Sequence, residues 1–152
     1  MALYNKERDD AFLNKLIRQR FPTALMNNHK WVKLITVLVA NYSAIKECRV
    51  KIIWDDETPV RLLLIEEDLQ FGLEFYDTSM EALITGNPKG WYQYKEIEWL
   101  DFPRYIISNN RKGTAITEEQ DLEFIKSTIE AIGQFHLELT SDNLRLYAYL
   151  RG

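Results

Sequence analysis

The sequence predicts an α+β fold: two N-terminal helices, a mainly antiparallel sheet, one further helix and a C-terminal hairpin. Three observations support this prediction. Apolar residues recur at helical spacing before residue 45, and they alternate at strand spacing between residues 49 and 103. Both patterns then appear once more, helix first and strands second, after residue 116.

The length of 152 residues fits a single domain spanning residues 1–152. Hydrophobic residues make up 46% and charged residues 28%, which is close to the usual composition of a soluble globular protein. A chain of this length buries about 70% of the surface that its unfolded form exposes. We therefore expect the fold to need no cofactor or metal. The net charge of −4 argues against general nucleic-acid binding, which needs a basic surface to neutralise phosphates.

The chain carries no signal for export or for membrane insertion. Cys48 is the only cysteine, so no internal disulfide can form. The first ten residues are polar and charged, and they lack the apolar core of a signal peptide. The longest strongly apolar run, residues 32–40, is too short to span a bilayer. We expect a soluble cytoplasmic protein.

Two helices are predicted near the N-terminus. The first covers residues 5–19, and Pro22 ends it because proline disfavours helical backbone at the residue before it. Its apolar residues form one patch: Phe12, Leu13, Leu16 and Ile17. The second helix begins near Asn27 or Asn28, either of which can cap it. Its apolar residues recur at helical spacing and are expected to face the core: Trp31, Leu34, Ile35, Leu38 and Tyr42.

Strands are predicted from residue 49 onward. Residues 49–54 alternate apolar and basic side chains, which is typical of a half-buried strand. Residues 60–65 form a nearly continuous apolar run that suits an interior strand. Residues 69–76 alternate again, whereas residues 77–85 fit either a short strand or a helical turn.

Residues 91–103 hold two of the four tryptophans and are predicted to form the central strand. Ile97 and Trp99 lie on one side at strand spacing. The alternation then breaks, because Leu100 falls on the side of Glu98. A strand with apolar groups on both sides is covered on both faces, so we expect Trp99 to be buried and structural.

The third helix is predicted to begin at a capping box. Residues 104–116 resemble a loop after Ile107, with an exposed turn at residues 109–113. Thr117 and Gln120 then have the spacing at which each side chain can bond the backbone amide of the other. The buried face of this helix is expected to contain Leu122, Ile125, Ile129 and Ile132.

A C-terminal hairpin is predicted on either side of the turn at residues 140–143, with leucines on its buried face. Its polar face comprises His136, Glu138, Arg145, Tyr147 and Tyr149. Because tyrosine and arginine are favoured at protein interfaces, this polar face is the candidate binding site. The alternative is an ordinary solvated sheet face.

No catalytic residue and no metal site are predicted. The chain lacks a glycine-rich phosphate loop, a nucleophile elbow and a His-Glu-x-x-His motif. Two histidines and one cysteine would need carboxylates to complete a zinc site. Glu96 and Glu98 could form an acid–base pair. We favour the alternative, in which they make cross-strand ion pairs with Arg49 and Lys51.

Three short patterns carry a resemblance to a known family. They are Trp31-x-x-Leu34, Arg49-Val50-Lys51 and Trp91-Tyr92-x-Tyr94-Lys95-Glu96-Ile97-Glu98-Trp99-Leu100-x-x-Pro103. Together they resemble a family of small uncharacterised bacterial proteins over roughly residues 28–103. That family has no established activity, so the resemblance implies no catalytic residue.

Two functions follow from these observations. By size and acidity, the chain also looks like the immunity proteins of bacterial toxin systems. The first function is therefore a non-enzymatic domain that binds a protein partner such as a toxin. The second is a small-molecule-binding domain or small hydrolase, with a pocket between the helices and the sheet.

Overall fold

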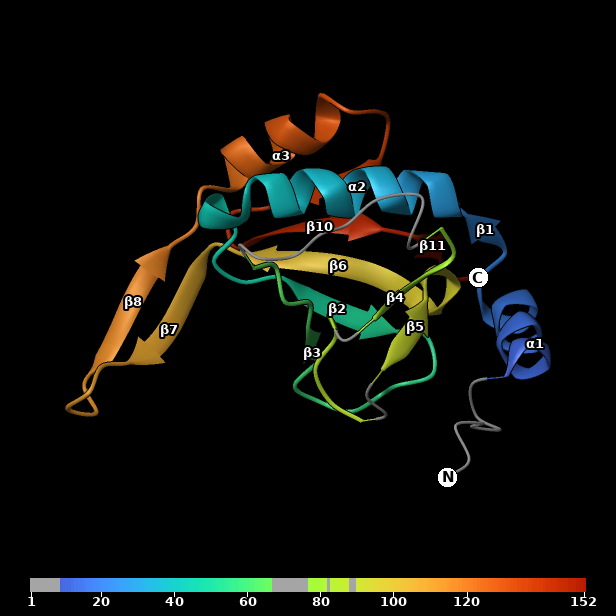
Figure 1. The fold of residues 1–152 in the computed structure, drawn as a ribbon, viewed down its shortest axis with the longest axis horizontal. Helices are drawn as coiled ribbons and strands as arrows, with labels where there is room; N and C mark the ends of the chain where they lie inside the picture. The colour runs from blue at the N-terminus through green and yellow to red at the C-terminus, as the bar shows by residue number, and fades with distance from the viewer. Residues whose placement is uncertain (1–8, 67–76, 82, 88–89) are drawn as a thin grey trace.

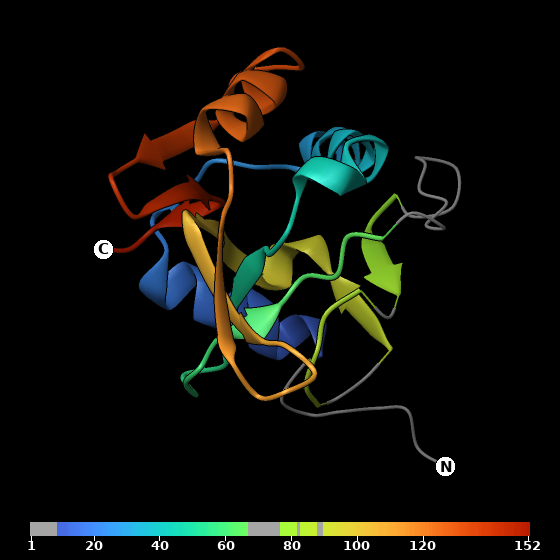
Figure 2. The ribbon, with the colours of Figure 1, turned by 90° about the vertical axis from the view of Figure 1, so that its left-hand side faces the viewer.

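The computed structural model describes residues 9–66, 77–81, 83–87 and 90–152. Its centre is a five-stranded sheet with the strand order β3-β2-β6-β10-β9, in which all neighbouring strands are antiparallel. α2 (Asn28–Ala40) and α3 (Leu122–Glu130) cover one face of this sheet (Figure 1). The turned view in Figure 2 shows both helices on the same side of the strands. The predicted α+β class is confirmed.

The other strands form three small antiparallel sheets around this centre. The central strands are β2 (Arg49–Ile52), β3 (Arg61–Leu62), β6 (Ile97–Pro103), β9 (His136–Leu139) and β10 (Asn143–Tyr147). The small sheets pair β1 (Thr23–Ala24) with β11 (Tyr149–Leu150), β4 (Ser79–Glu81) with β5 (Trp91–Gln93), and β7 (Tyr105–Asn109) with β8 (Ala115–Glu119). The described residues also contain two 3-10 turns, η2 (Tyr42–Ala44) and η3 (Tyr94–Glu96).

The two N-terminal helices begin and end largely as predicted. α1 (Asp10–Arg20) is capped by Asp9 and ends at Phe21, before the proline; the predicted start at residue 5 lies outside the described residues. α2 is capped by Asn27, whose side chain accepts a hydrogen bond from the backbone amide of Lys30 at 2.8 Å. Tyr42 does not extend the buried face of α2, because the chain has already turned into η2 and leaves this ring exposed.

β6 is the central strand and, as expected, is covered on both faces along most of its length, because Trp99 is its only residue that is not buried. A register shift in its pairing with β2 leaves Glu98 as an extra residue, which is a β-bulge. Beyond the bulge, Leu100 and Phe102 return to the core and are fully buried. Trp99 turns to the opposite side and is only half-buried. The expected burial of Trp99 is therefore wrong, because the broken alternation marks a bulge.

The predicted interior strand at residues 60–65 is shorter than expected but has neighbours on both sides. The Leu63 amide donates to the Cys48 carbonyl at 2.8 Å, and the Leu64 amide donates to the Leu83 carbonyl at 2.7 Å. The ambiguous residues 77–85 contribute β4, which is a strand and not a helical turn. The strand predicted at residues 69–76 lies outside the described residues.

β7 and β8 form a projecting hairpin, residues 105–119, which we call the arm (Figure 1). The prediction of a loop here is right for the turn at the tip and wrong for both strands. The reason is exposure: strands that are solvated on both sides need no apolar alternation, so they show no strand signal. Thr117 lies in β8 and does not cap α3, whose N-cap is Asp121.

The C-terminal hairpin of β9 and β10 is confirmed. Leu144 and Leu146 on β10 are fully buried, as predicted. Leu137 is only half-buried and Leu139 is exposed, so their predicted burial is wrong. β9 is the outermost strand of the sheet, and side chains at an edge have neighbours on one side only.

Gln120 is fully buried at the base of the arm, where it makes four hydrogen bonds instead of the predicted capping box. Its carbonyl accepts from the backbone amides of Lys46 at 2.7 Å and Glu47 at 3.1 Å. Its amide group donates to the carbonyls of Glu47 at 3.1 Å and Pro103 at 2.8 Å. This is the full hydrogen-bonding capacity of a glutamine, and it joins the start of β2 to the end of β6.

Replacing Gln120 with alanine should lower the free energy of unfolding by about 2–4 kcal/mol, because buried backbone groups lose their partners. Urea unfolding followed by circular dichroism measures this. Gln134→Ala, at an exposed position, is the matched control and should change stability by less than about 0.5 kcal/mol. Equal effects of the two substitutions would show that the Gln120 bonds do not hold the arm's base.

Candidate functional site

The face of the central sheet opposite α2 and α3 carries charged and aromatic side chains from four strands. Strand register aligns one row across the sheet: Arg49, Asp101, Arg145 and Glu138. It aligns a second row beside the first: Lys51, Trp99, Tyr147 and His136. We call these residues the open face. α1 lies beyond one end of the sheet and the arm beyond the other (Figure 1).

Charges alternate along the first row, and Asp101 forms an ion pair with Arg145 within it. Asp101 is only 4% exposed, and its carboxylate accepts from the side-chain amide of Asn143 and from Arg145 Nε at 3.1 Å. Arg49 pairs with Glu47 at 2.7 Å. A partner therefore meets charged groups that are already oriented by their neighbours.

The guanidinium of Arg145 lies over the indole ring of Trp99, 3.7 Å from the ring centroid. A cation–π contact of this kind is worth about 0.5–1 kcal/mol at an exposed site and more when water is removed. Because Asp101 holds the same guanidinium, Arg145 has little freedom to leave the ring. The stack is a preformed platform at the centre of the face.

Tyr147 and its neighbours form the second cluster of the face. The ring of His136 meets the Tyr147 ring edge to face, with 5.5 Å between centroids. The Tyr147 hydroxyl donates to Glu138 at 3.3 Å. Partial burial, helped by the Glu138 charge, raises the pKa of Tyr147, so its hydroxyl stays protonated and able to donate at neutral pH.

Four of the five predicted binding residues thus lie together, but Tyr149 does not. It belongs to β11, is only 8% exposed, and donates its hydroxyl to the Lys95 carbonyl at 2.9 Å. Burial raises the pKa of Tyr149 to about 12. The chain leaves β10 at Ala148, whose amide donates to the Glu98 carbonyl at 2.8 Å, and the alternation ends there.

Trp99 and Asp101 also belong to this face, although neither is among the predicted binding residues. Their spacing of two residues is the signal that could have found them, because neighbours at this spacing share one side of a strand. Counting Glu98 as a bulge places both residues opposite Leu100 and Phe102. The two basic residues of β2 then fall on the same face by register.

Glu96 and Glu98 do not form the predicted cross-strand pairs with Arg49 and Lys51. Glu96 is buried in η3, where it accepts from Trp54 Nε1 at 2.9 Å and from the Gln93 amide at 2.8 Å. Glu98 is also buried and binds Arg151 with both oxygens, at 2.8 and 2.9 Å. The bulge separates their environments, so each carboxylate has its own donors.

Metal-binding and thiol chemistry have no support among the described residues. They contain no group of three or more histidine, cysteine or acidic side chains that could hold a metal. The thiol of Cys48 is buried, and this burial raises its pKa, which disfavours the thiolate that a nucleophile needs.

Among the described residues, no helix is long and apolar enough to cross a membrane.

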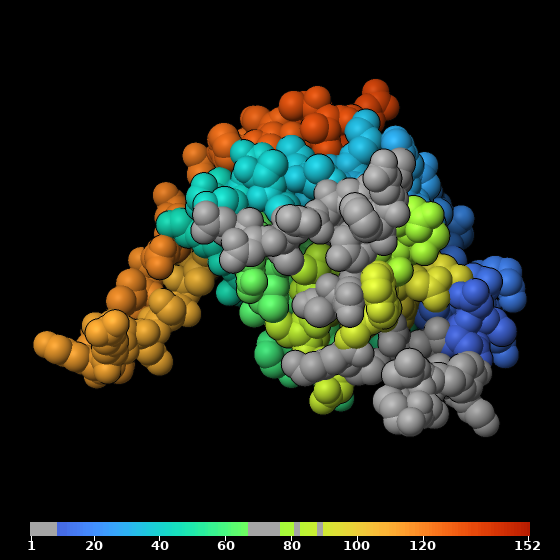
Figure 3. All heavy atoms as spheres, viewed as in Figure 1, coloured from blue at the N-terminus to red at the C-terminus, as the bar shows by residue number. Residues whose placement is uncertain are grey.

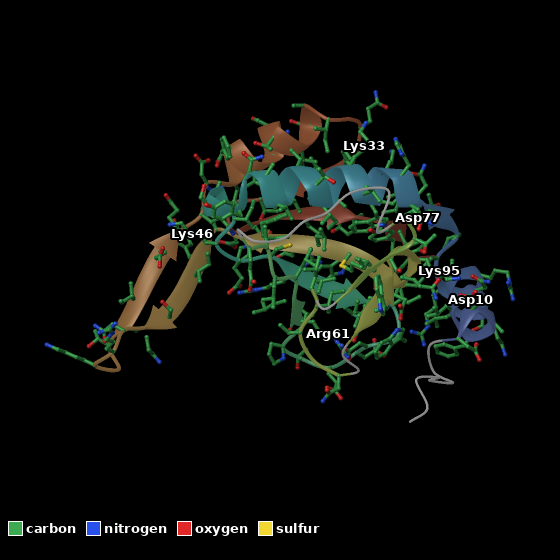
Figure 4. The ribbon with its side chains drawn as sticks, in the orientation of Figure 1. Asp10, Lys33, Lys46, Arg61, Asp77 and Lys95 are labelled. Atoms are coloured by element: carbon green, nitrogen blue, oxygen red, sulfur yellow. The ribbon has the colours of Figure 1, made fainter. Side chains whose placement is uncertain are left out.

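A cleft of about 860 Å³ is lined in part by Arg61. Figure 4 labels this residue. Its walls come from residues 54–62 and 85–87. The guanidinium of Arg61 donates to Asp55 at 2.6 Å, to the Thr85 carbonyl at 3.3 Å and to the Tyr92 hydroxyl. Arg61 therefore closes the loops around the cleft, and most of its donors are engaged.

The comparisons with known proteins identify a family and no characterised relative. The sequence model described as "Family of unknown function (DUF6678)" matches residues 13–152. No curated protein and no solved structure matches the chain. The functional argument consequently rests on the geometry and composition of the chain itself.

Two aromatic residues of β6 should differ in their contribution to stability. Phe102→Ala removes a fully buried ring and should cost about 3–5 kcal/mol. Trp99→Ala removes a half-buried ring on the open face and should cost less than about 2 kcal/mol. Chemical denaturation of both variants measures the difference. Equal costs would show that Trp99 belongs to the core and not to the open face.

Ionisation of the buried Tyr149 hydroxyl should lower the free energy of unfolding at alkaline pH. Its folded-state pKa of about 12 lies above the ordinary value of 10.0, so the folded state keeps the proton longer than the unfolded state. The resulting stability is complete below pH 10 and is lost as the pH rises towards 12. Unfolding free energies measured across this window should fall less steeply for Tyr149→Phe than for the wild type. Parallel slopes would contradict the burial of this hydroxyl.

Proposed function

The chain belongs to this family of unknown function, and we propose that it is a non-enzymatic domain that binds a protein partner on the open face. One observation carries the proposal: Arg145 is stacked on Trp99 and held there by the buried carboxylate of Asp101. Tryptophan, tyrosine and arginine are the residues that most often dominate the energy of protein interfaces. Side chains that are already ordered lose less entropy on binding.

The dimensions of the open face favour a macromolecule over a small ligand. It crosses four strands, which at the usual spacing of neighbouring strands is about 15 Å. Small-molecule sites are concave and enclose most of their ligand. A sheet surface with half-buried aromatic rings and internally paired charges instead resembles the mixed polar and aromatic surface of protein interfaces.

Within this class we propose a sequestering protein of the immunity or antitoxin type, with a bacterial toxin as partner. The small size of the chain and its net charge of −4 support this. An acidic protein attracts a basic partner and accelerates its capture. The buried free thiol suits the reducing cytoplasm, where such a protein would act.

The cleft beside Arg61 supports the second candidate function, a small-molecule-binding domain. It combines an aromatic wall at Trp54 with polar groups from Thr85 and Asn87, as ligand sites commonly do. A hydrolase gains no support, because Glu96 and Glu98 are held by separate donors. Ligand binding here would raise the melting temperature without involving the open face.

Truncating Arg145 and Tyr147 together should weaken the cognate complex at least about 30-fold, which corresponds to about 2 kcal/mol. The partner is first captured with the wild-type chain, identified by mass spectrometry and purified. Calorimetric titration then compares the wild type with the Arg145→Ala/Tyr147→Ala double variant. A melting curve of the variant shows whether the fold is retained.

Lys33→Ala/Val37→Ala is the matched control, because both residues lie on α2, on the helix-covered side of the sheet, where they line a groove with Ile132. It should leave the affinity unchanged. If the control weakens binding and the open-face variant does not, the partner docks on the helices. Failure to bind any protein, together with a ligand that stabilises the wild type, would favour the cleft.

A further inference from the structure

The arm presents strand edges that the described part of the chain leaves without a partner strand. β7 and β8 pair only with each other among these residues. Three of their large apolar side chains are exposed: Tyr105 at 52%, Ile107 at 73% and Ile116 at 41%. Figure 3 shows the arm standing away from the body of the molecule. Free edges of this kind are templates for pairing with another chain.

The hydrogen-bond register shows which backbone groups of β7 point outward. The Asn110 amide donates to the Thr114 carbonyl at 2.8 Å, and the Gln120 amide donates to the Arg104 carbonyl at 2.7 Å. Even-numbered pairs therefore make the bonds within the arm. The odd-numbered residues of β7 direct their N–H and C=O groups away from β8: Tyr105, Ile107 and Asn109.

The two edges of the arm differ in charge. β7 has the sequence Tyr-Ile-Ile-Ser-Asn, with no charged residue and no proline. β8 contains Glu118 and Glu119. Charges and prolines are the usual protection of an edge against pairing, so β7 is the unprotected edge. Pairing β8 with its own copy would gather four glutamates on one short ladder.

We propose that β7 pairs antiparallel with β7 of a second copy, around a two-fold axis through Ile107. The two arms then form a four-stranded sheet with β8 of each copy on the outside. Ile107 lies opposite its own copy, and Tyr105 lies opposite Asn109. Contacts of this kind are self-complementary, as a two-fold interface requires.

The charge distribution of the arm suits this occupant. Arg111 and Lys112 lie in the turn at the tip, whereas Glu119 lies at the base beside Glu118, whose carboxylate binds Lys46 at 3.0 Å. Antiparallel pairing brings the basic tip of each arm towards Glu119 of the other copy and towards Arg104, whose charge Glu123 balances. The long-range attraction offsets part of the repulsion between two chains that each carry a charge of −4.

The base of the arm is held in place, so the arm needs little further ordering when it pairs with a second copy. Gln120 bonds Lys46, which precedes β2, and Pro103 at the end of β6. Arg104, at the bend between β6 and β7, donates to the Ser141 carbonyl at 2.7 Å and pairs with Glu123 of α3 at 3.1 Å. A preorganised arm loses less entropy when it docks.

Sedimentation equilibrium tests the proposal. The wild type should form a dimer whose population rises with concentration. Ile107→Pro removes an outward N–H and leaves the even-numbered bonds of the arm intact, so it should raise the dissociation constant at least about tenfold. Thr117→Pro is the matched control, because its N–H points outward from the β8 edge, and it should leave the dimer unchanged.

A covalent test decides the result even if Ile107→Pro unfolds the arm. Ile107→Cys should form a disulfide-linked dimer in a glutathione redox buffer, because the two-fold axis brings the paired residues within disulfide range. Thr117→Cys should not, and the native Cys48 is buried. A wild type that stays monomeric up to about 1 mM overturns the proposal. The proposal is also overturned if Ile107→Pro leaves the dissociation constant of the dimer unchanged and Ile107→Cys yields no disulfide-linked dimer. Neither result bears on a partner at the open face.

Discussion

The β-bulge at Glu98 is the constraint on which much of the remaining structure depends. It turns Trp99 and Asp101 to the face opposite the helices while Leu100 and Phe102 stay in the core. The Glu98 carbonyl also accepts the Ala148 amide at 2.8 Å, and its carboxylate binds Arg151. One extra residue therefore sets the composition of the open face and redirects the C-terminal strand towards β1. Bulges commonly re-aim side chains beside functional sites.

A second constraint positions the arm. The side chain of Gln120 satisfies backbone groups of two segments, residues 46–47 just before β2 and Pro103 at the end of β6. A buried amide with all its bonds made is strongly directional, because any movement of one segment leaves a polar group without a partner. The arm is thus exposed along its length and held at its base. Its exposed strands are available to a second chain, and the bonds at its base fix its orientation relative to the central sheet.

The open face and the arm offer different kinds of interaction to a partner. The open face offers side chains: a cation held over an indole, a tyrosine beside a histidine, and charges already paired. The arm offers backbone groups, whose pairing depends little on side-chain identity. The two surfaces can therefore be tested and changed independently. Catalysis gains no support from either, since the buried carboxylates Glu96 and Glu98 each serve a structural bond.

The sequence by itself determined the α+β class, the buried positions Leu13 and Leu16 of α1, most of the buried face of α2, and four members of the open face. These features depend on periodicity within one element, which is visible locally. Only the tertiary structure decided the bulge, the arm and the burial of Tyr149. Each depends on contacts between residues far apart in the chain, such as Glu98 with Ala148 and Gln120 with Lys46. Periodicity carries no record of such contacts, because a strand's partner, and not its own pattern, sets its register and its exposed edge.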